Sequence, residues 1–499
     1  MNKLKNGTPL IVVFFLFSIV FTGIQACDSK KVPHVVKASD ADVPAGAVAE
    51  KRGRDLYLKH CSGCHHEERY GLVGPPLLPE YFGRKKAKAI REIIAEGLPA
   101  TNMPPFKDLL KGAELDSILT YIRTPLESPV WGMDDIRKTW ETSYFSLEEK
   151  EPRFDMSNFF MIVEGGEGRV HFMDGDSFQR LGVVDVGAIH GGPKYGRDLR
   201  YAFAISRGGL LVKYDLYDQK LVGKIRGGIS TRNIAVSSSG DYIAQANLLP
   251  KNLVIIDAFS MKPKEIIDPE GTPGAVYTLK TRGQFVLSIK DKHEILLIDD
   301  SSLDLRRISI DQPFTDFFID PKEGFLIGTA RGSDHFSVVD LDKGEVVKTF
   351  PAEGGMPHLA SAAVWTEGGD TFAAFPQIGK PLLTVMKMYD WEVMASVKTK
   401  GAGFFARTHD KIQHIWVDTG SDTIQLIDKK TLKAVAEVIP QPGKRAMHIE
   451  FDKEGRHALV SVWEDEGEVV IYDTAKLEVK KRMPFKKPVG KYNATNKNF

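Results

Sequence analysis

The chain has 499 residues, of which 42% are hydrophobic and 27% charged, a composition typical of globular protein and a length that allows two or more domains. Its formal net charge is +1 at pH 7, and it contains no charge run or low-complexity tract. Because nucleic-acid binding requires a basic surface, this balance argues against nucleic acid as a partner.

The first 27 residues have the layout of an export signal. Two lysines precede an almost entirely apolar stretch, 11–24, which is too short to span a membrane. Residues 24–27 (Ile-Gln-Ala-Cys) resemble a bacterial lipobox, in which the cysteine becomes the lipidated first residue. We therefore expect a periplasmic protein tethered to the membrane through Cys27. Ordinary cleavage nearby, which would leave a soluble periplasmic protein, is the alternative.

The segment after the signal is predicted to be a tether, because residues 28–50 show no periodicity. It leads to a Cys-x-x-Cys-His motif. Cys61 and Cys64 can add to the two vinyl groups of a haem, and His65 can bind its iron. A thioredoxin-like redox pair is the alternative, but the surroundings do not alternate strand and helix as that fold requires. The motif thus predicts one covalent haem c.

Met103 is the candidate for the second ligand of that iron. It precedes two prolines, which stiffen a loop that can hold the thioether in place. A methionine that fills a gap in the core is the alternative. Residues 53–60 predict a helix that enters the haem motif, and residues 114–123 an amphipathic helix that closes the domain. From about 51 to 124 the chain resembles a class I cytochrome c.

A connector with prolines and tryptophans, 125–157, precedes a repeat. From 158 onward, short apolar runs that end in an acidic residue recur every 41 to 47 residues, which is the period of one four-stranded propeller blade. We therefore expect an all-β eight-bladed propeller over 158–499, behind an all-α cytochrome domain. The eight runs, of which the sixth is degenerate, end at Asp174, Asp215, Asp257, Asp299, Asp340, Lys387, Asp428 and Asp473.

A ring of blades leaves a central channel in which a large flat ligand can lie. A c-type cytochrome ahead of such a propeller resembles the cytochrome cd1 family, whose propeller holds haem d1. The resemblance implies that His190 ligates the iron of haem d1 and that Arg207 and Arg232 face its carboxylates. A turn histidine and solvent-facing arginines are the alternatives. The likeness continues, in order, through the segments 188–207, 228–234, 404–418, 461–463 and 488–493.

Two branches of that family differ in their histidines. The nitrite reductase branch carries two histidines on the distal face of haem d1; His358 matches one, as a distal group or an alternative axial ligand, but Thr315 stands in place of the other. A hydroxyl cannot serve as that proton donor near neutral pH. The second branch oxidises dihydro-haem d1, and His448 stands where it carries an essential histidine. A hydrogen-bonded polar group at a strand end is the alternative for His448, and we expect His409 to be structural.

The sequence therefore predicts an oxidoreductase of haem d1 biosynthesis. It would convert a propionate of dihydro-haem d1 to an acrylate, with His448 and His358 as catalytic groups and haem c as the acceptor of single electrons. A cytochrome cd1 nitrite reductase and a non-enzymatic haem d1 carrier are the alternatives, although a carrier needs no haem c. Besides the substrate, the expected partners are a periplasmic electron acceptor, the membrane, and nitrite reductase or another protein of haem d1 maturation.

Overall fold

The predicted export signal and lipobox lie outside the residues that the structure describes, and so does His190. Of the predicted tether, only residues 45–50 are described, and they form the first part of a helix. Within the described ranges, no helix is both long and apolar enough to cross a membrane. The computed structural model describes residues 45–71, 74–82, 86–97, 103–126, 130–143, 150–189, 191–330, 332–352 and 357–496.

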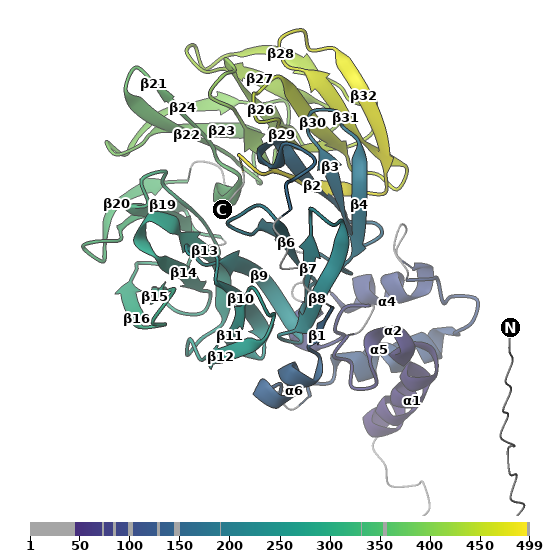
Figure 1. The fold of residues 1–499 in the computed structure, drawn as a ribbon. Coiled ribbons are helices and arrows are strands. Elements are labelled where there is room, and N and C mark those ends of the chain that lie inside the picture. The colour runs from purple at the N-terminus through teal and green to yellow at the C-terminus, as the bar shows by residue number, and fades with distance from the viewer. Residues whose placement is uncertain are drawn as a thin grey trace, which may run out of the picture. The chain divides into compact units, whose positions relative to one another are not determined.

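The N-terminal part of the described chain is helical, as predicted (Figure 1). The helix predicted over 114–123 is α5, which buries Leu115, Ile118 and Ile122 along one face. Their spacing of three and four residues places them on one stripe, which packs against the buried Ile90 and Ile94 of α4. The helices are α1 (Ala45–His60), α2 (Ser62–His65), α3 (Pro79–Phe82), α4 (Ala87–Glu96) and α5 (Gly112–Arg123).

The described parts of the connector contact the blades of β5–β8 and β9–β12. The connector contains α6 (Met133–Lys138) and the short strand β1 (Glu141–Thr142), which pairs with β8 as a fifth strand of that blade. The indole N–H of Trp131 donates to the Arg226 carbonyl (3.1 Å), and that of Trp140 to the Ser260 carbonyl (3.0 Å). The tryptophans thus bury apolar surface while their polar atoms remain bonded.

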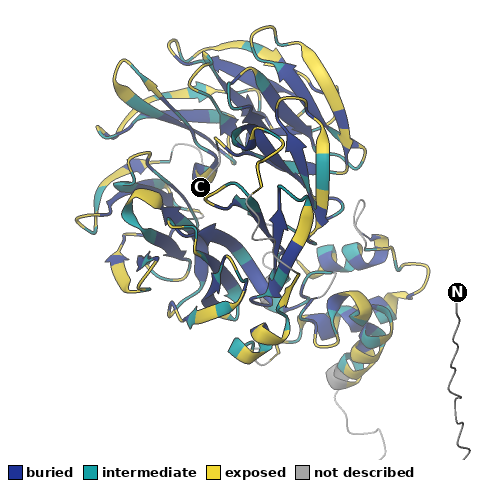
Figure 2. Ribbon diagram, viewed as in Figure 1, coloured by how far each residue is buried: buried dark blue, intermediate teal, exposed yellow. Residues whose placement is uncertain are grey.

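The remaining described residues form eight antiparallel sheets around a common axis (Figure 1), which confirms the predicted eight-bladed propeller. The first strand of each blade lies nearest the axis. Exposed residues gather on the fourth strands (Figure 2), as in β16 and β32. The blades, with their strands in pairing order, are β5 (Lys194–Tyr195), β6 (Tyr201–Ile205), β7 (Leu210–Asp215), β8 (Lys220–Arg226); β9 (Ser230–Val236), β10 (Tyr242–Leu249), β11 (Lys251–Asp257), β12 (Pro263–Ile267); β13 (Pro273–Leu279), β14 (Gln284–Ile289), β15 (Glu294–Asp299), β16 (Leu305–Ser309); β17 (Asp316–Ile319), β18 (Phe325–Thr329), β19 (His335–Asp340), β20 (Glu345–Pro351); β21 (Ala363–Glu367), β22 (Asp370–Pro376), β23 (Leu382–Lys387), β24 (Glu392–Lys398); β25 (Ala406–Arg407), β26 (His414–Asp418), β27 (Ile424–Asp428), β28 (Ala434–Val438); β29 (Ala446–Phe451), β30 (His457–Val462), β31 (Gly467–Asp473), β32 (Val479–Phe485); and β33 (Pro488–Asn493), β2 (Phe159–Glu164), β3 (Arg169–Asp174), β4 (Arg180–Asp185).

Each apolar run of the repeat is the third strand of its blade, and the residue that ends it shapes the following turn. The Asp299 carboxylate accepts hydrogen bonds from the backbone N–H groups of Ser301 (3.0 Å) and Ser302 (2.8 Å). Aspartate forms such turns because its short side chain reaches the backbone two and three residues on. In the degenerate copy, Lys387 instead forms an ion pair with Asp390 (2.7 Å).

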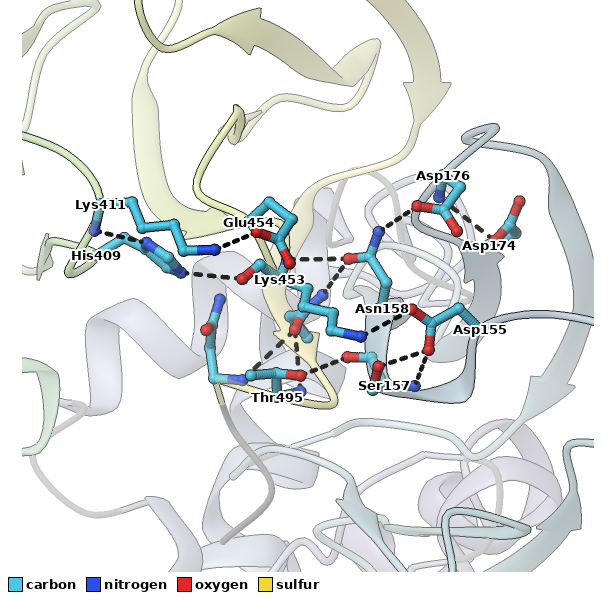
Figure 3. Close-up of polar contacts among 12 residues, drawn as sticks. Asp155, Ser157, Asn158, Asp174, Asp176, His409, Lys411, Lys453, Glu454 and Thr495 are labelled. Carbon is cyan, nitrogen blue, oxygen red and sulfur yellow. Dashed lines mark hydrogen bonds and ion pairs between the residues drawn. The ribbon is translucent and has the colours of Figure 1, made fainter.

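Both ends of the propeller chain build its last blade, which we call the closing blade (β33, β2, β3 and β4). Figure 3 shows the contacts beside it. The buried Asn158 side chain donates to Asp176 and accepts from the Lys453 backbone (3.0 Å) and the Asn493 amide (3.1 Å). His409 lies 3.2 Å from the Lys453 carbonyl and so joins two other blades. This contact agrees with the expected structural role of His409.

Replacement of Asn158 by Ala should weaken ring closure. The Lys453 N–H and the Asn493 amide would lose their acceptor. This loss should lower the free energy of unfolding by about 2 to 4 kcal/mol. Lys453→Met is the control, since its ion pair with Asp155 is largely exposed and should contribute at most about 1 kcal/mol. Urea denaturation followed by circular dichroism measures both variants. Equal stabilities of Asn158→Ala and the wild type would contradict this role.

Candidate functional site

The first part of the candidate site is the Cys-x-x-Cys-His motif, in which Cys61 follows α1 and residues 62–65 form α2. Cys61 is buried and Cys64 is exposed, and neither forms a disulfide with another described residue. The His65 imidazole is buried, and its Nδ1 lies 2.7 Å from the Pro75 carbonyl oxygen, to which it can donate. That hydrogen bond fixes the tautomer whose Nε2 carries a free lone pair. Burial lowers the pKa of His65 and thereby favours the neutral form that binds metal.

The surroundings of His65 fit a haem ligand. A Cβ atom at Gly74 would lie 2.5 Å from the imidazole Cε1 atom, so the backbone approaches the ring more closely than any other residue type allows. Met103 is half-buried and packs against the same apolar cluster as Cys61. The structure therefore brings two thiols, a neutral imidazole and a thioether to one small helical domain, which is the donor set of a c-type haem.

The second part lies at the centre of the propeller, where each of the eight blades contributes a polar side chain. Each residue lies on the first strand of its blade or just before it, and we call the set the channel ring. Its members affect one another's pKa values across blade boundaries, as Tyr492 does with Arg407 and Tyr277. The channel ring consists of Lys194, Arg232, Tyr277, Asp316, His358, Arg407, His448 and Tyr492.

One side of the channel ring is cationic. Burial lowers the pKa of Arg232, and the neighbouring Arg207 lowers it further. Burial likewise lowers the pKa of Lys194 to about 8, and its Nζ lies 5.8 Å from the ring centroid of Tyr277. The structure therefore brings together the two arginines predicted from the sequence. Lys194 and Tyr277 were not predicted, because an isolated polar residue on a strand carries no signal of its own.

His358 is held by the blades on both sides of it. Its Nδ1 lies 2.5 Å from the Phe404 carbonyl oxygen and 2.9 Å from the Ser361 hydroxyl. The Asp316 carboxylate accepts from the backbone N–H of Leu359 (2.8 Å), next to His358 in the chain. Burial raises the pKa of Asp316, and His358 is the main group that opposes this rise. Donation from Nδ1 to the Phe404 carbonyl leaves Nε2 of His358 available to a ligand.

His448 has an unfavourable conformation in β29. Its backbone φ is +58°, in the left-handed region, and the register of β29 on β30 shifts between Met447 and Ile449. A non-glycine residue there costs about 1 to 3 kcal/mol and persists only where its surroundings enforce it. The imidazole is 7% exposed and packs 4.0 Å from the Phe405 ring centroid.

One ring nitrogen of His448 is unused by the described residues. Among the described residues, its buried Nδ1 has no hydrogen-bond partner. Burial lowers its pKa well below the ordinary histidine value, and Lys491, Arg407 and His358 lower it further. A buried, neutral imidazole with an unused ring nitrogen fits a ligand that supplies the missing contact.

Comparison with known proteins assigns both parts of the chain. The family described as Cytochrome D1 heme domain matches residues 154–497, and the family described as Cytochrome C oxidase, cbb3-type, subunit III matches residues 48–122. The chain belongs to the cytochrome D1 heme domain family. This finding confirms the predicted relationship to cytochromes cd1.

Two relatives and one solved structure align with almost the whole length of this cytochrome D1 heme domain protein. Dihydro-heme d1 dehydrogenase of Pseudomonas aeruginosa is 37% identical over 91% of this chain and 96% of its own length. Nitrite reductase of Stutzerimonas stutzeri is 23% identical over 92% of this chain and 95% of its own. A solved structure of dihydro-heme d1 dehydrogenase NirN in complex with DHE is 37% identical, with a TM-score of 0.85, and covers 90% of this chain and 100% of its own.

A buried carboxylate supports Phe404 and Phe405, the second of which packs on His448. The Asp418 oxygens accept from the backbone N–H groups of Phe404 (2.8 Å) and Phe405 (3.0 Å). Burial raises the pKa of Asp418 to about 6, although these two hydrogen bonds and Arg445 oppose the rise. Asp418 is thus a further part of the cytochrome D1 heme domain site that sequence reasoning missed, because its role depends on a loop that precedes its strand.

Asp418 should make folding less favourable as pH rises. Its folded pKa of about 6 exceeds the unfolded value of about 3.9, so the folded state binds the proton more tightly, and this stabilisation is lost between about pH 4 and 6. The free energy of unfolding of Asp418→Asn minus that of the wild type should therefore increase by about 2 to 3 kcal/mol from pH 4 to pH 7. Urea denaturation at each pH measures this difference.

Asp299→Asn is the matched control, because turn hydrogen bonds lower the pKa of Asp299 to about 2. Stabilisation by Asp299 is fully present above the unfolded pKa and is lost only between about pH 4 and 2, so the control difference should stay nearly constant from about pH 4 to pH 7. A pH-independent difference for Asp418→Asn would contradict a raised pKa.

Proposed function

We propose that this protein is a periplasmic oxidoreductase that oxidises dihydro-haem d1 to haem d1. The observation that carries the proposal is the buried, neutral His448 imidazole, which has an unpartnered Nδ1 among the described residues and lies in a channel ring with cationic groups. The 37% identical relative named dihydro-heme d1 dehydrogenase, and its solved structure with DHE, support the same reaction.

The reaction removes two electrons and two protons from a propionate and leaves an acrylate. The neutral His448 imidazole would accept a proton from the substrate side chain, because general bases work best when they are unprotonated at the working pH. Arg207 and Arg232, together with Lys194, would pair with substrate carboxylates, since charge-assisted hydrogen bonds orient such groups. These contacts would hold the reacting carbon beside His448.

Two histidines would hold the iron of the substrate. His358 is proposed as one of them, since its Nδ1 is engaged by Phe404 and Ser361 and its Nε2 is available. His190, which lies outside the described residues, is proposed as the other. As an iron ligand or distal group, His358 would contact the substrate directly and so share in catalysis with His448.

Electrons would leave through the helical domain. Cys61 and Cys64 are proposed to attach one haem c covalently, and His65 and Met103 to ligate its iron. Haem c would accept electrons one at a time. The apolar core of the domain, in which Cys61 is buried, would limit the access of water to the haem.

Location and partners follow from the export signal. Lipidation of Cys27 is proposed to anchor the protein on the periplasmic side of a membrane. A periplasmic protein would accept the electrons from haem c. The product is proposed to pass to nitrite reductase or to another protein of haem d1 maturation.

Nitrite reduction is less well supported. The backbone N–H of Thr315 donates to the Thr329 carbonyl (2.9 Å), and its hydroxyl lies 3.4 Å from the same oxygen. A hydroxyl engaged in this way does not replace the second distal histidine of a reductase, because its pKa lies far above neutrality.

His448→Asn should abolish turnover without loss of the fold. Asparagine tolerates a positive φ, so the backbone of β29 can keep its conformation while the base is removed. The rate should fall at least about 100-fold, as expected for loss of a general base. The measurement is an anaerobic absorption time course of purified protein mixed with dihydro-haem d1, which follows the oxidised d1 bands and the reduction of haem c.

His409→Asn is the control, because His409 joins two blades away from the channel ring and should leave the rate unchanged. Retained turnover in His448→Asn would exclude His448 as the base. A wild-type protein that arrives with tightly bound haem d1 and turns over nitrite would instead be a reductase.

The pH dependence of turnover should reflect the lowered pKa of His448. Only the neutral imidazole accepts a proton, and its pKa lies well below the usual histidine value, so the rate should remain high below about pH 6.5. Single-turnover rates between pH 5 and 8 test this. A rate that is half-maximal at or above pH 6.5 would show that another group is the base.

A further inference from the structure

A buried lysine lies behind His448. Lys491 on β33 is 0% exposed, and its Nζ donates hydrogen bonds to the His448 carbonyl oxygen and to the Ser461 hydroxyl (2.6 Å). The Ser461 hydroxyl in turn donates to the Val489 carbonyl (3.1 Å). The lysine thus links the closing blade to β29 and β30 of the neighbouring blade.

Burial of this lysine is unfavourable in itself. Burial lowers its pKa well below the usual lysine value, and only the carboxylates of Glu450 and Asp418 oppose this shift. The pairing of β33 with β2 uses backbone groups and does not require a charged side chain at this position. Because closure of the propeller does not require the amine of Lys491, we expect this buried group to have another role.

The strand register explains what Lys491 contributes. Met447 pairs with Ser461 and Ile449 pairs with Val460, so no residue of β30 is left opposite His448. The carbonyl of His448 is therefore left out of the β29–β30 ladder, and Lys491 is its hydrogen-bond donor. The lysine thereby supplies a hydrogen bond to the carbonyl of the residue at the bulge.

We propose that Lys491 is the positioning residue for His448: its hydrogen bond to the His448 carbonyl holds the left-handed bulge that directs the imidazole toward the centre of the channel ring. The proposal rests on the proposed function, in which His448 is the base. It also makes the geometry of the base depend on ring closure, since Lys491 lies on the C-terminal strand that completes the closing blade.

Lys491→Met tests the proposal, because methionine keeps an unbranched side chain of similar length and removes the donor. The kcat for dihydro-haem d1 should fall about 10- to 100-fold, as a misplaced base would predict, while the dissociation constant for the substrate changes less than about 2-fold. Absorbance titration under anaerobic conditions gives the dissociation constant, and the single-turnover time course gives the rate.

Lys213→Met is the matched control. Lys213 is also 0% exposed and donates to a backbone carbonyl, that of Phe259 (2.8 Å), but it lies on β7, the third strand of its blade, with its Nζ 3.8 Å from the ring centroid of Tyr201. Both variants should lower the melting temperature. Only Lys491→Met should lower kcat, and an equal loss in both variants would overturn the proposal in favour of general destabilisation.

Amide hydrogen exchange of the substrate-free protein separates this proposal from the proposed function. Lys491→Met should speed exchange across residues 446–451, whereas Lys213→Met should not. Faster exchange supports the positioning role even if the wild type fails to oxidise dihydro-haem d1, a result that would refute the proposed function alone. Unchanged exchange together with unchanged kcat would refute the positioning role.

Ser461→Ala serves if Lys491→Met does not fold. It removes the second partner of Lys491 and keeps the lysine itself, so kcat should fall about 3- to 10-fold with substrate affinity retained. Wild-type kcat and wild-type exchange over 446–451 in this variant would overturn the proposal.

Discussion

Closure of the propeller is the constraint on which the rest of the structure depends. Because β33 from the C-terminal end pairs with β2 from the start of the propeller, strands from both ends of the propeller chain complete the last blade and close the ring. Closure also brings eight first strands around one axis, so that residues far apart in the chain meet. The contact of Lys491 with His448 crosses from the closing blade to its neighbour and exists only in the closed ring.

The channel ring concentrates groups that burial alone would disfavour. Burial lowers the pKa values of Arg232, Lys194 and His448 and raises that of Asp316. Such groups persist where fixed backbone contacts hold them and where a ligand can supply the missing partner. A tetrapyrrole with carboxylate side chains is a ligand of this kind, since its negative groups match the cationic side of the ring. The cost of the site to stability is then offset when substrate binds.

Sequence reasoning succeeded where chemistry is local. The apolar runs that define the blades end in turn residues such as Asp299, whose hydrogen bonds reach only two or three positions. It failed for the pairing of β1 with β8, because a two-residue strand is defined by its partner and not by its own pattern. It also failed for Lys194, Tyr277 and Asp418, whose neighbours come from other blades or other loops.

His448 shows the limit of what could be predicted from the sequence. Family resemblance singled it out, but neither its left-handed backbone nor its unpartnered Nδ1 could be inferred from the neighbouring residues. The sequence by itself determined the order of the two domains, the haem motif and the number of blades, because covalent spacing and turn chemistry act within a few residues. Only the tertiary structure decided which side chains share the channel and in what protonation state, because burial, and charges from other blades, exist only once the ring is closed.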